Sequence, residues 1–195
     1  MTAPSERETA RGGYQAGAAA DAHVRKDGDR WTLVFVRELR HRPDKVWTAL
    51  TDPSHLREWA PFDADRDLGS TGSAKLAMAG APEPETLDCS VIRADAPTLL
   101  EYTWGGDVLR WELEEIDTGT RLTLRHTLDD RSWGPKVAAG WHICLDVAER
   151  ALDGQPIGRI VAHDAMRVGW ERLNAEYSER FGIENSGWPA DLPGT

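Results

Sequence analysis

The sequence predicts an α+β domain in which a curved antiparallel sheet wraps around a long C-terminal helix. Three observations support this class. Residues 31–39 alternate with a period of two, residues 69–128 contain only strand-like runs, and a helical apolar stripe follows and ends near Gly154. Because only one face of such a sheet needs cover, the closing helix can fill the concave side.

The first elements are predicted from a change in period. Trp31–Leu39 alternates as a strand, and Pro43 then suits the first turn of a helix that ends at Thr51-Asp52-Pro53. A second short helix is expected from Pro53 to Trp59, before Pro61.

The middle of the chain predicts an antiparallel meander. The breaks between its runs contain Gly, Asp or Pro, and Gly105-Gly106-Asp107 is typical of a tight hairpin connection. The expected strands are Ser73–Met78, Glu85–Arg93, Leu99–Trp104, Val108–Ile116 and Arg121–Leu128. Glu101, Thr103, Arg110, Glu112 and Glu114 are expected on the outer face, as a solvated surface of cross-strand ion pairs.

After Trp133-Gly134-Pro135 the period becomes helical again. One apolar stripe is formed by Val137, Trp141, Cys144, Leu145, Ala148 and Leu152. Asp146 lies off that stripe, so the pattern places it on the solvent side, where its removal is expected to leave stability unchanged. A helical extension is expected from about residue 157, with one helix over Ile160–Phe181.

The sequence therefore predicts one domain over residues 30–182 with a tail at each end. Residues 1–29 are rich in Ala, Gly and charged residues and are expected to be disordered. Residues 183–195 contain two prolines and two glycines and are expected to be irregular, with Trp188 as a contact to the domain.

Composition argues against several partner classes. The net charge of −10, with no dense Lys/Arg run, disfavours nucleic acid and anionic membranes. No apolar run approaches the roughly 20 residues of a membrane span, and no signal peptide is recognised. Cys89 and Cys144 are isolated from each other and from any metal-ligand spacing, which favours a reducing compartment, so a cytoplasmic location is expected.

Two segments resemble a known family. Pro43-Asp44-Lys45-Val46-Trp47-Thr48-Ala49-Leu50-Thr51-Asp52-Pro53, followed by Leu56–Trp59, is similar to the opening of the START-like (SRPBCC, Bet v 1-like) superfamily, in the branch of the activator of Hsp90 ATPase homologue domain. Gly140-Trp141-His142-Ile143-Cys144-Leu145-Asp146 and Leu152-Asp153-Gly154 resemble the terminal helix of that branch.

The resemblance covers roughly residues 31–154 and implies a helix-grip fold with an interior cavity. It carries over no catalytic residue, cofactor or metal. The superfamily includes lipid carriers, hormone receptors and aromatase/cyclase-like proteins, so the fold leaves the function open. The name of the branch also admits contact with a chaperone, although the first thirty residues are too few to form the separate N-terminal domain of the eukaryotic activator.

Aromatic residues are the expected lining of the cavity. Trp141 lies on the core stripe of the terminal helix, Tyr102 and Trp104 share one strand face, and Trp111 lies on the next strand. Trp59 is expected near the cavity mouth, beside the carboxylate-rich loop Asp63–Asp67. That loop lacks the Gly and Glu of an EF-hand, so a solvated turn is favoured over a cation site and no metal is expected.

His126 shares its strand face with Leu122, Leu124 and Leu128 and therefore points toward the same cavity. It is the candidate catalytic base, against the alternative of a buried histidine with ordinary hydrogen-bond partners. Three functions follow as hypotheses: binding of a small apolar or aromatic molecule, a cyclase- or hydrolase-like enzyme using the same cavity, or a co-chaperone-type interaction module. The sequence favours the first, because nine tryptophans accompany the implied cavity. It predicts no cofactor and leaves the oligomeric state open.

Overall fold

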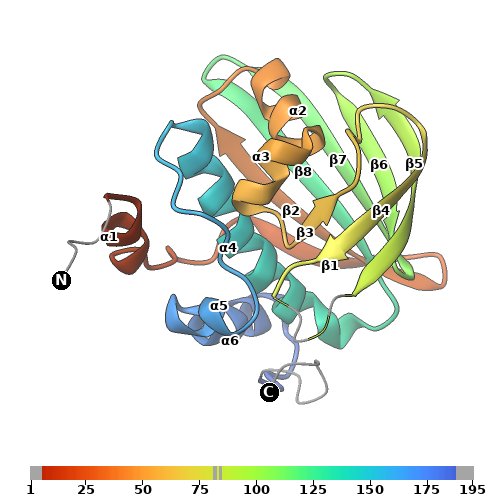
Figure 1. Cartoon of the computed structure of the whole chain (residues 1–195). Coiled ribbons are helices and arrows are strands. Elements are labelled where there is room, and N and C mark those ends of the chain that lie inside the picture. The colour runs from red at the N-terminus through yellow and green to blue at the C-terminus, as the bar shows by residue number, and fades with distance from the viewer. Residues whose placement is uncertain (1–5, 81–82, 84, 188–195) are drawn as a thin grey trace.

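The computed structural model, which describes residues 6–80, 83 and 85–187, is built on an antiparallel sheet curled around a helix (Figure 1). In the described residues the sheet has eight strands in the order β1-β2-β8-β7-β6-β5-β4-β3. The strands are β1 (Ala22–Asp27), β2 (Arg30–Leu39), β3 (Phe62–Ala64), β4 (Gly72–Met78), β5 (Thr86–Asp95), β6 (Leu99–Trp104), β7 (Asp107–Ile116) and β8 (Gly119–Leu128). The α+β helix-grip class predicted from the sequence is confirmed.

Two short helices connect β2 to the rest of the sheet at the places that the prolines indicate. They are α2 (Pro43–Thr51) and α3 (Pro53–Trp59), and each begins with Pro, which lacks the N–H that a first helical turn leaves unpaired. Asp52 ends one helix and caps the next, because its carboxylate accepts from the backbone N–H groups of Ser54 at 2.8 Å and His55 at 3.2 Å.

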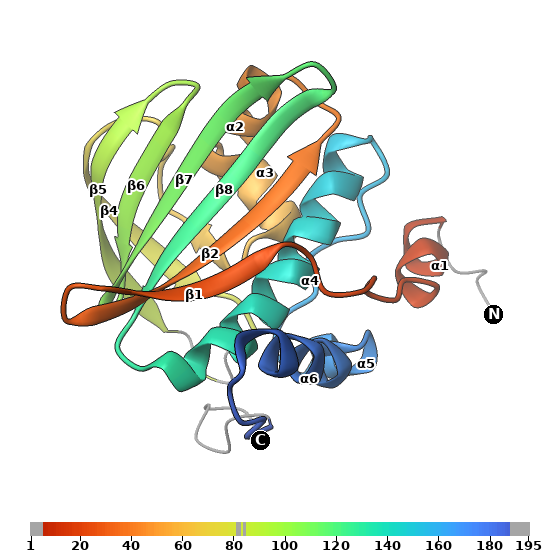
Figure 2. The same cartoon turned by 180° about the vertical axis from the view of Figure 1, so that it is seen from behind.

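The long helix α4 (Gly134–Leu152) lies diagonally across the concave face of the sheet (Figures 1 and 2). Its predicted stripe is in the core: Trp141, Cys144, Leu145 and Ala148 are all buried. The outer face of the sheet carries the predicted ion pairs, among them Arg110 with Glu101 at 3.1 Å and Arg125 with Glu112 at 3.2 Å.

The structure corrects the N-terminal boundary of the domain. Helix α1 (Glu6–Gly12) and strand β1 lie within residues 1–29, which the sequence analysis assigned to a disordered tail. β1 pairs with β2 from Ala22↔Phe35 to Asp27↔Arg30, and Tyr14 is only 3% exposed. Composition did not reveal this segment because backbone pairing and one buried tyrosine hold it, rather than an apolar pattern of its own.

The C-terminal extension also differs from the prediction. Instead of one helix it forms α5 (His163–Arg167) and α6 (Trp170–Phe181), since Gly169 between them adopts a left-handed φ of 104°. Residues 183–187 have no regular structure, and Trp188 lies outside the described residues.

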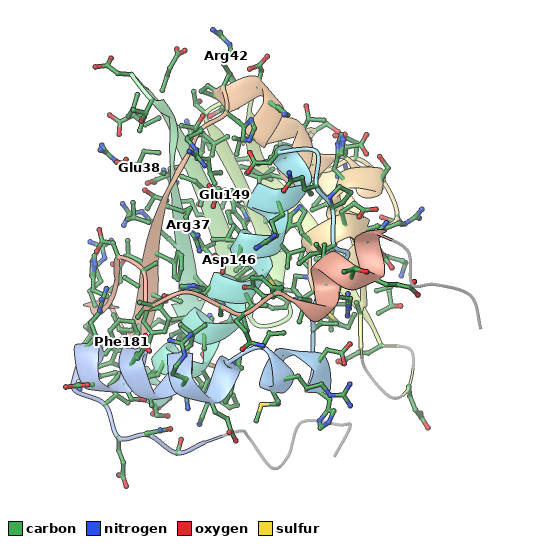
Figure 3. The ribbon with its side chains drawn as sticks, turned by 90° about the vertical axis from the view of Figure 1, so that its left-hand side faces the viewer. Arg37, Glu38, Arg42, Asp146, Glu149 and Phe181 are labelled. Atoms are coloured by element: carbon green, nitrogen blue, oxygen red, sulfur yellow. The ribbon has the colours of Figure 1, made fainter. Side chains whose placement is uncertain are left out.

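Asp146 is the largest departure from the predicted helix pattern. Its carboxylate is largely buried against β2, where Arg37 donates to it at 2.7 Å (Figure 3). The Tyr14 hydroxyl donates to its other oxygen at 2.7 Å, and the His142 ring lies 3.5 Å from that oxygen. The expectation that Asp146 faces solvent is therefore wrong, because the N-terminal segment covers this side of α4.

The pKa of Asp146 reflects this environment. Burial alone would raise it, but the contact with His142, the charge of Arg37 and the hydrogen bond from Tyr14 lower it to about 2. The carboxylate is thus held ionised inside the fold.

Helix α6 fastens the other side of the N-terminal segment. Glu176 accepts from the backbone N–H of Ala19 at 2.8 Å, and the Arg172 guanidinium donates to the carbonyl of Ala16 at 2.6 Å. The Tyr177 hydroxyl accepts from the N–H of Ala20 at 2.9 Å and lies 2.9 Å from Nδ1 of His142.

No helix of the described residues is long and apolar enough to cross a membrane.

The anchoring role of Tyr14 can be measured directly. Tyr14→Ala should lower the free energy of unfolding by about 3–5 kcal/mol, because a buried aromatic side chain and a hydrogen bond to a carboxylate are lost together. Gln15→Ala, at the exposed neighbouring position, is the matched control and should change it by less than about 0.5 kcal/mol. Equal values for the two variants in urea denaturation would show that the segment is not anchored.

Candidate ligand-binding site

The aromatic residues predicted to line a cavity do gather in one cluster between α4 and the sheet. Trp111 of β7 lies edge-to-face with Trp141 of α4, with ring centroids 5.3 Å apart, and with Trp59 of α3 at 6.1 Å. Trp104 lies 5.6 Å from Trp141, and Tyr102 accepts a hydrogen bond from the Trp111 indole at 3.2 Å. Strand register and helix phase, both readable from the sequence, bring these residues together.

Three of these residues are part of a filled core. Trp111 and Tyr102 are each 1% exposed, and the buried Trp111 indole donates to the Tyr102 hydroxyl. The Trp59 indole donates to the carbonyl of Ala49 at 2.9 Å, and Trp59 also lines a groove of about 550 Å³ between α2, α3 and the end of α4. The rings pack at distances usual for aromatic pairs, so this part of the interior is occupied by side chains.

Free space remains at the other end of the cluster, in a hollow of about 170 Å³ that we call the ring pocket. The sheet and α4 form one wall, with Trp104, His126, Val137, Gly140, Trp141 and Cys144. The other wall comes from the segment after α4, with Ile160, Val161, Ala162, Ala165 and Trp170, and Pro61 completes the rim. Of the six residues predicted to line a cavity, Trp104, His126 and Trp141 line the ring pocket.

The segment 157–170, here called the closing segment, is held in place by two arginines. Arg11 of α1 donates to the carbonyl of Arg159 at 2.7 Å and to that of Gly158 at 3.2 Å. Arg159 donates to the carbonyl of Arg57 at 2.9 Å and pairs with Asp63. Asp63, part of the predicted carboxylate-rich turn, therefore anchors the wall of the pocket.

Local backbone features also shape the closing segment. Ala162 has a positive φ of 49°, a region that costs a non-glycine residue free energy. At Gly80, whose φ is 80°, a Cβ would lie 2.9 Å from Val161, so only glycine allows this close approach. This wall was not predicted, because Ile160 and Val161 were assigned to one helix over Ile160–Phe181, whereas α5 begins only at His163.

Gly140 of α4 is one of the residues that line the ring pocket. It lies in the middle of α4, where Gly is less favourable than Ala by about 0.5–1 kcal/mol. A Cβ at this position would meet no atom within 4 Å outside its own helix turn and chain neighbours. Close packing therefore does not require Gly at position 140. In the sequence, the signal that could have indicated this pocket residue was a glycine within a segment of helical period.

His126 has partners on both ring nitrogens. The Trp141 indole donates to Nδ1 at 3.0 Å, so in the neutral ring the proton is on Nε2, which donates to the Asp107 carboxylate at 3.2 Å. Burial lowers the pKa of His126, although Asp107 opposes that shift. Asp107 in turn pairs with Arg30, which also contacts Asp129 at 2.9 Å. This arrangement fixes the orientation of the Trp141 ring.

A second hollow of about 390 Å³, the mouth hollow, opens on the far side of the same wall. It shares Trp104, His126 and Val137 with the ring pocket. Cys144, which lines the ring pocket, is buried, and burial raises the pKa of its thiol to about 12. The thiol is therefore protonated at neutral pH and is a poor nucleophile.

Fold and site together define a helix-grip domain with an apolar pocket beside its terminal helix. The family model described as "Activator of Hsp90 ATPase homolog 1-like protein" matches residues 40–153, more than half of the chain. The chain therefore belongs to the family of activator of Hsp90 ATPase homolog 1-like proteins. A search of curated proteins found no match.

Similar solved structures agree with this fold. A conserved protein of unknown function from Enterococcus faecalis, EF2215, is 17% identical with a TM-score of 0.63, covering 82% of this chain and 89% of that one. CalU16 from Micromonospora echinospora is 22% identical with a TM-score of 0.58, covering 81% and 94%. An AHSA1-like protein from Aeromonas hydrophila is 18% identical with a TM-score of 0.54, covering 68% and 99%.

The buried state of His126 predicts a pH dependence of stability. A histidine in the unfolded chain has a pKa near 6.5, whereas the folded-state pKa of His126 lies lower, so below about pH 6.5 the unfolded state binds more protons. The stability associated with neutral His126 is therefore complete above about pH 6.5 and is lost as the pH falls. Its loss should approach about 1.4 kcal/mol per pH unit.

The difference in unfolding free energy between the wild type and His126→Gln should therefore shrink between about pH 7.5 and pH 5. His23→Gln, at an exposed position, is the control for general effects of losing a histidine. A difference that stays constant over this range would contradict the assigned protonation state.

Proposed function

We propose that the protein binds a small apolar or aromatic molecule in the ring pocket. The observation that supports this most is Gly140, which leaves a hollow open beside Trp141 at a helix position where packing does not require glycine. An apolar cavity of about 150 Å³ is large enough to bind benzene, so a hollow of about 170 Å³ fits one aromatic ring rather than a lipid chain.

The lining supports the same ligand class. Val137, Ile160, Val161 and Ala165 offer apolar contacts, and Trp104 and Trp141 offer ring faces and edges. His126 is the main polar group, and both of its nitrogens are already hydrogen-bonded. The pocket therefore favours binding of a ligand that needs few hydrogen bonds over catalysis of a reaction that needs an unpaired base.

The enzyme hypothesis would require His126 to release the Trp141 indole before accepting a proton from a substrate. The lowered pKa of His126 also makes it a weak base.

The co-chaperone hypothesis has less support, since ion pairs such as Arg121 with Glu38 and Glu114 occupy the outer face of the sheet. Both cysteines are unpaired and buried, which is compatible with a cytoplasmic location.

Filling the pocket tests the proposal. Gly140→Leu should abolish binding of 2-phenylethanol, a one-ring probe, because the new side chain occupies the ring's space. It should not lower the unfolding free energy, since leucine favours a helix more than glycine by about 0.8 kcal/mol. Binding is measured by calorimetry and by the change in tryptophan emission.

Gly140→Ala is the matched control. It gains a similar helix preference while adding one carbon, so it should retain weakened binding. Unchanged affinity in Gly140→Leu would place the ligand elsewhere, and a wild type that binds no one-ring probe would overturn the proposal.

A further inference from the structure

We infer that the site continues past Trp104 into the mouth hollow, and that its ligand is an aromatic ring with a cationic amine on a short tail. The inference rests on the proposed function, which places the aromatic ring of the ligand in the ring pocket, and it adds the chemistry of the ligand's tail. Binding sites for small molecules usually measure about 300–1,000 Å³. The ring pocket alone, at about 170 Å³, is below this range, whereas the mouth hollow beside it holds about 390 Å³.

Trp104 is the part of the wall between the two hollows that is held least by hydrogen bonds. His126 is fixed by two hydrogen bonds and Val137 belongs to α4, but the Trp104 indole donates only to the sulfur of Met78, at 3.3 Å, a weak acceptor. Trp104 also precedes Gly105 and Gly106 at the end of β6, and it is partly exposed. A shift of its ring, which would let a tail pass, costs contacts with the rings of Phe62, His126 and Trp141 but little hydrogen bonding.

The mouth hollow has acidic groups at its rim and apolar groups below. Met78, Leu87 and Leu128 supply the apolar part, and Glu85, Asp107 and Asp129 supply three carboxylates. Arg30 pairs with Asp107 and Asp129, while among the described residues Glu85 makes no ion pair. The three carboxylates outnumber the two cations at this rim, Arg30 and the Lys136 ammonium over the Trp133 ring, so the rim keeps a net negative charge that favours a cationic ligand over a carboxylate, in a chain whose net charge is −10.

Trp133 adds an aromatic face to the same rim. Its side chain is 41% exposed, and the ammonium of Lys136 lies 5.0 Å from the centroid of its ring. The structure thus already holds one ammonium on this aromatic surface, an interaction that a ligand amine can also make.

Three probes with one ring and tails of similar length separate these contributions. They are 2-phenylethanol, which is neutral, 2-phenylethylamine, which is cationic, and 3-phenylpropionate, which is anionic. Near neutral pH and at low salt, the amine should bind the wild type roughly five- to tenfold more tightly than the alcohol, and the propionate more weakly than the alcohol.

Charge removal at the rim provides the decisive comparison. In Glu85→Gln/Asp129→Asn the advantage of the amine should fall to about twofold or less, while the affinity for the alcohol stays unchanged and confirms that the variant is folded. Glu114→Gln/Glu115→Gln removes two carboxylates at the far end of β7, one of them paired with Arg121, and should keep the full advantage.

The outcomes distinguish this inference from the proposed function. If the alcohol binds and the amine binds no better, or if both double variants lose the advantage equally, the cationic tail is wrong and the ring pocket remains. If the amine binds and the alcohol does not, the mouth hollow is the site and the ring pocket fails. If none of the probes binds, both proposals are overturned.

Discussion

The arrangement of the molecule depends on the buried carboxylate of Asp146. This group joins β2 through Arg37 and the N-terminal segment through Tyr14, and His142 beside it contacts Tyr177 of α6. A buried ion pair contributes little net stability over an apolar pair, but removing one partner leaves an uncompensated charge and is costly. The network therefore allows α4 few alternative positions. Figure 3 shows Arg37 and Asp146, which belong to β2 and α4, close to each other.

Fixing α4 in this way fixes the site on its other side. Trp141 is one residue from His142, about 100° around the helix, so the polar face and the pocket face are rigidly related. With α4 held from outside, Gly140 and Trp141 both line the ring pocket, and the Trp141 indole donates to Nδ1 of His126 at 3.0 Å. One face of α4, with His142 and Asp146, is buried by the polar network, and another face, with Trp141, is buried against the aromatic rings and His126 of the sheet.

Most of the fold was predictable because its signals are local. Pro43 and Pro53 mark helix starts, Asp52 caps α3, and the alternation of Leu99–Trp104 gives β6 without reference to the rest of the chain. The strand β1 and the position of Asp146 were not predictable in this way. β1 is held by backbone pairing with the adjacent β2 rather than by an apolar pattern of its own, and the position of Asp146 depends on contacts between residues more than a hundred positions apart, such as Tyr14 with Asp146.

The candidate site was predictable to the same degree. The rings were expected from strand and helix phase, but which rings meet and which leave space depends on side-chain packing. The closing segment was missed for a related reason, since Arg11 and Arg159 hold it through backbone carbonyls that have no sequence pattern. It also lies outside residues 40–153, so family membership does not define the pocket.

The unfolding free energy of Asp146→Ala is the most direct test of this account. It should fall by about 3–5 kcal/mol, because Arg37 loses its 2.7 Å bond to Asp146 and keeps the longer contact to Glu149 at 3.5 Å, while Tyr14 and His142 lose the same buried acceptor. Leu145→Ala on the sheet side should lose about 2–5 kcal/mol, and Asp88→Ala, at a carboxylate that is 94% exposed, less than about 1 kcal/mol. A loss for Asp146→Ala no larger than that for Asp88→Ala would contradict the claim that α4 is held from both sides.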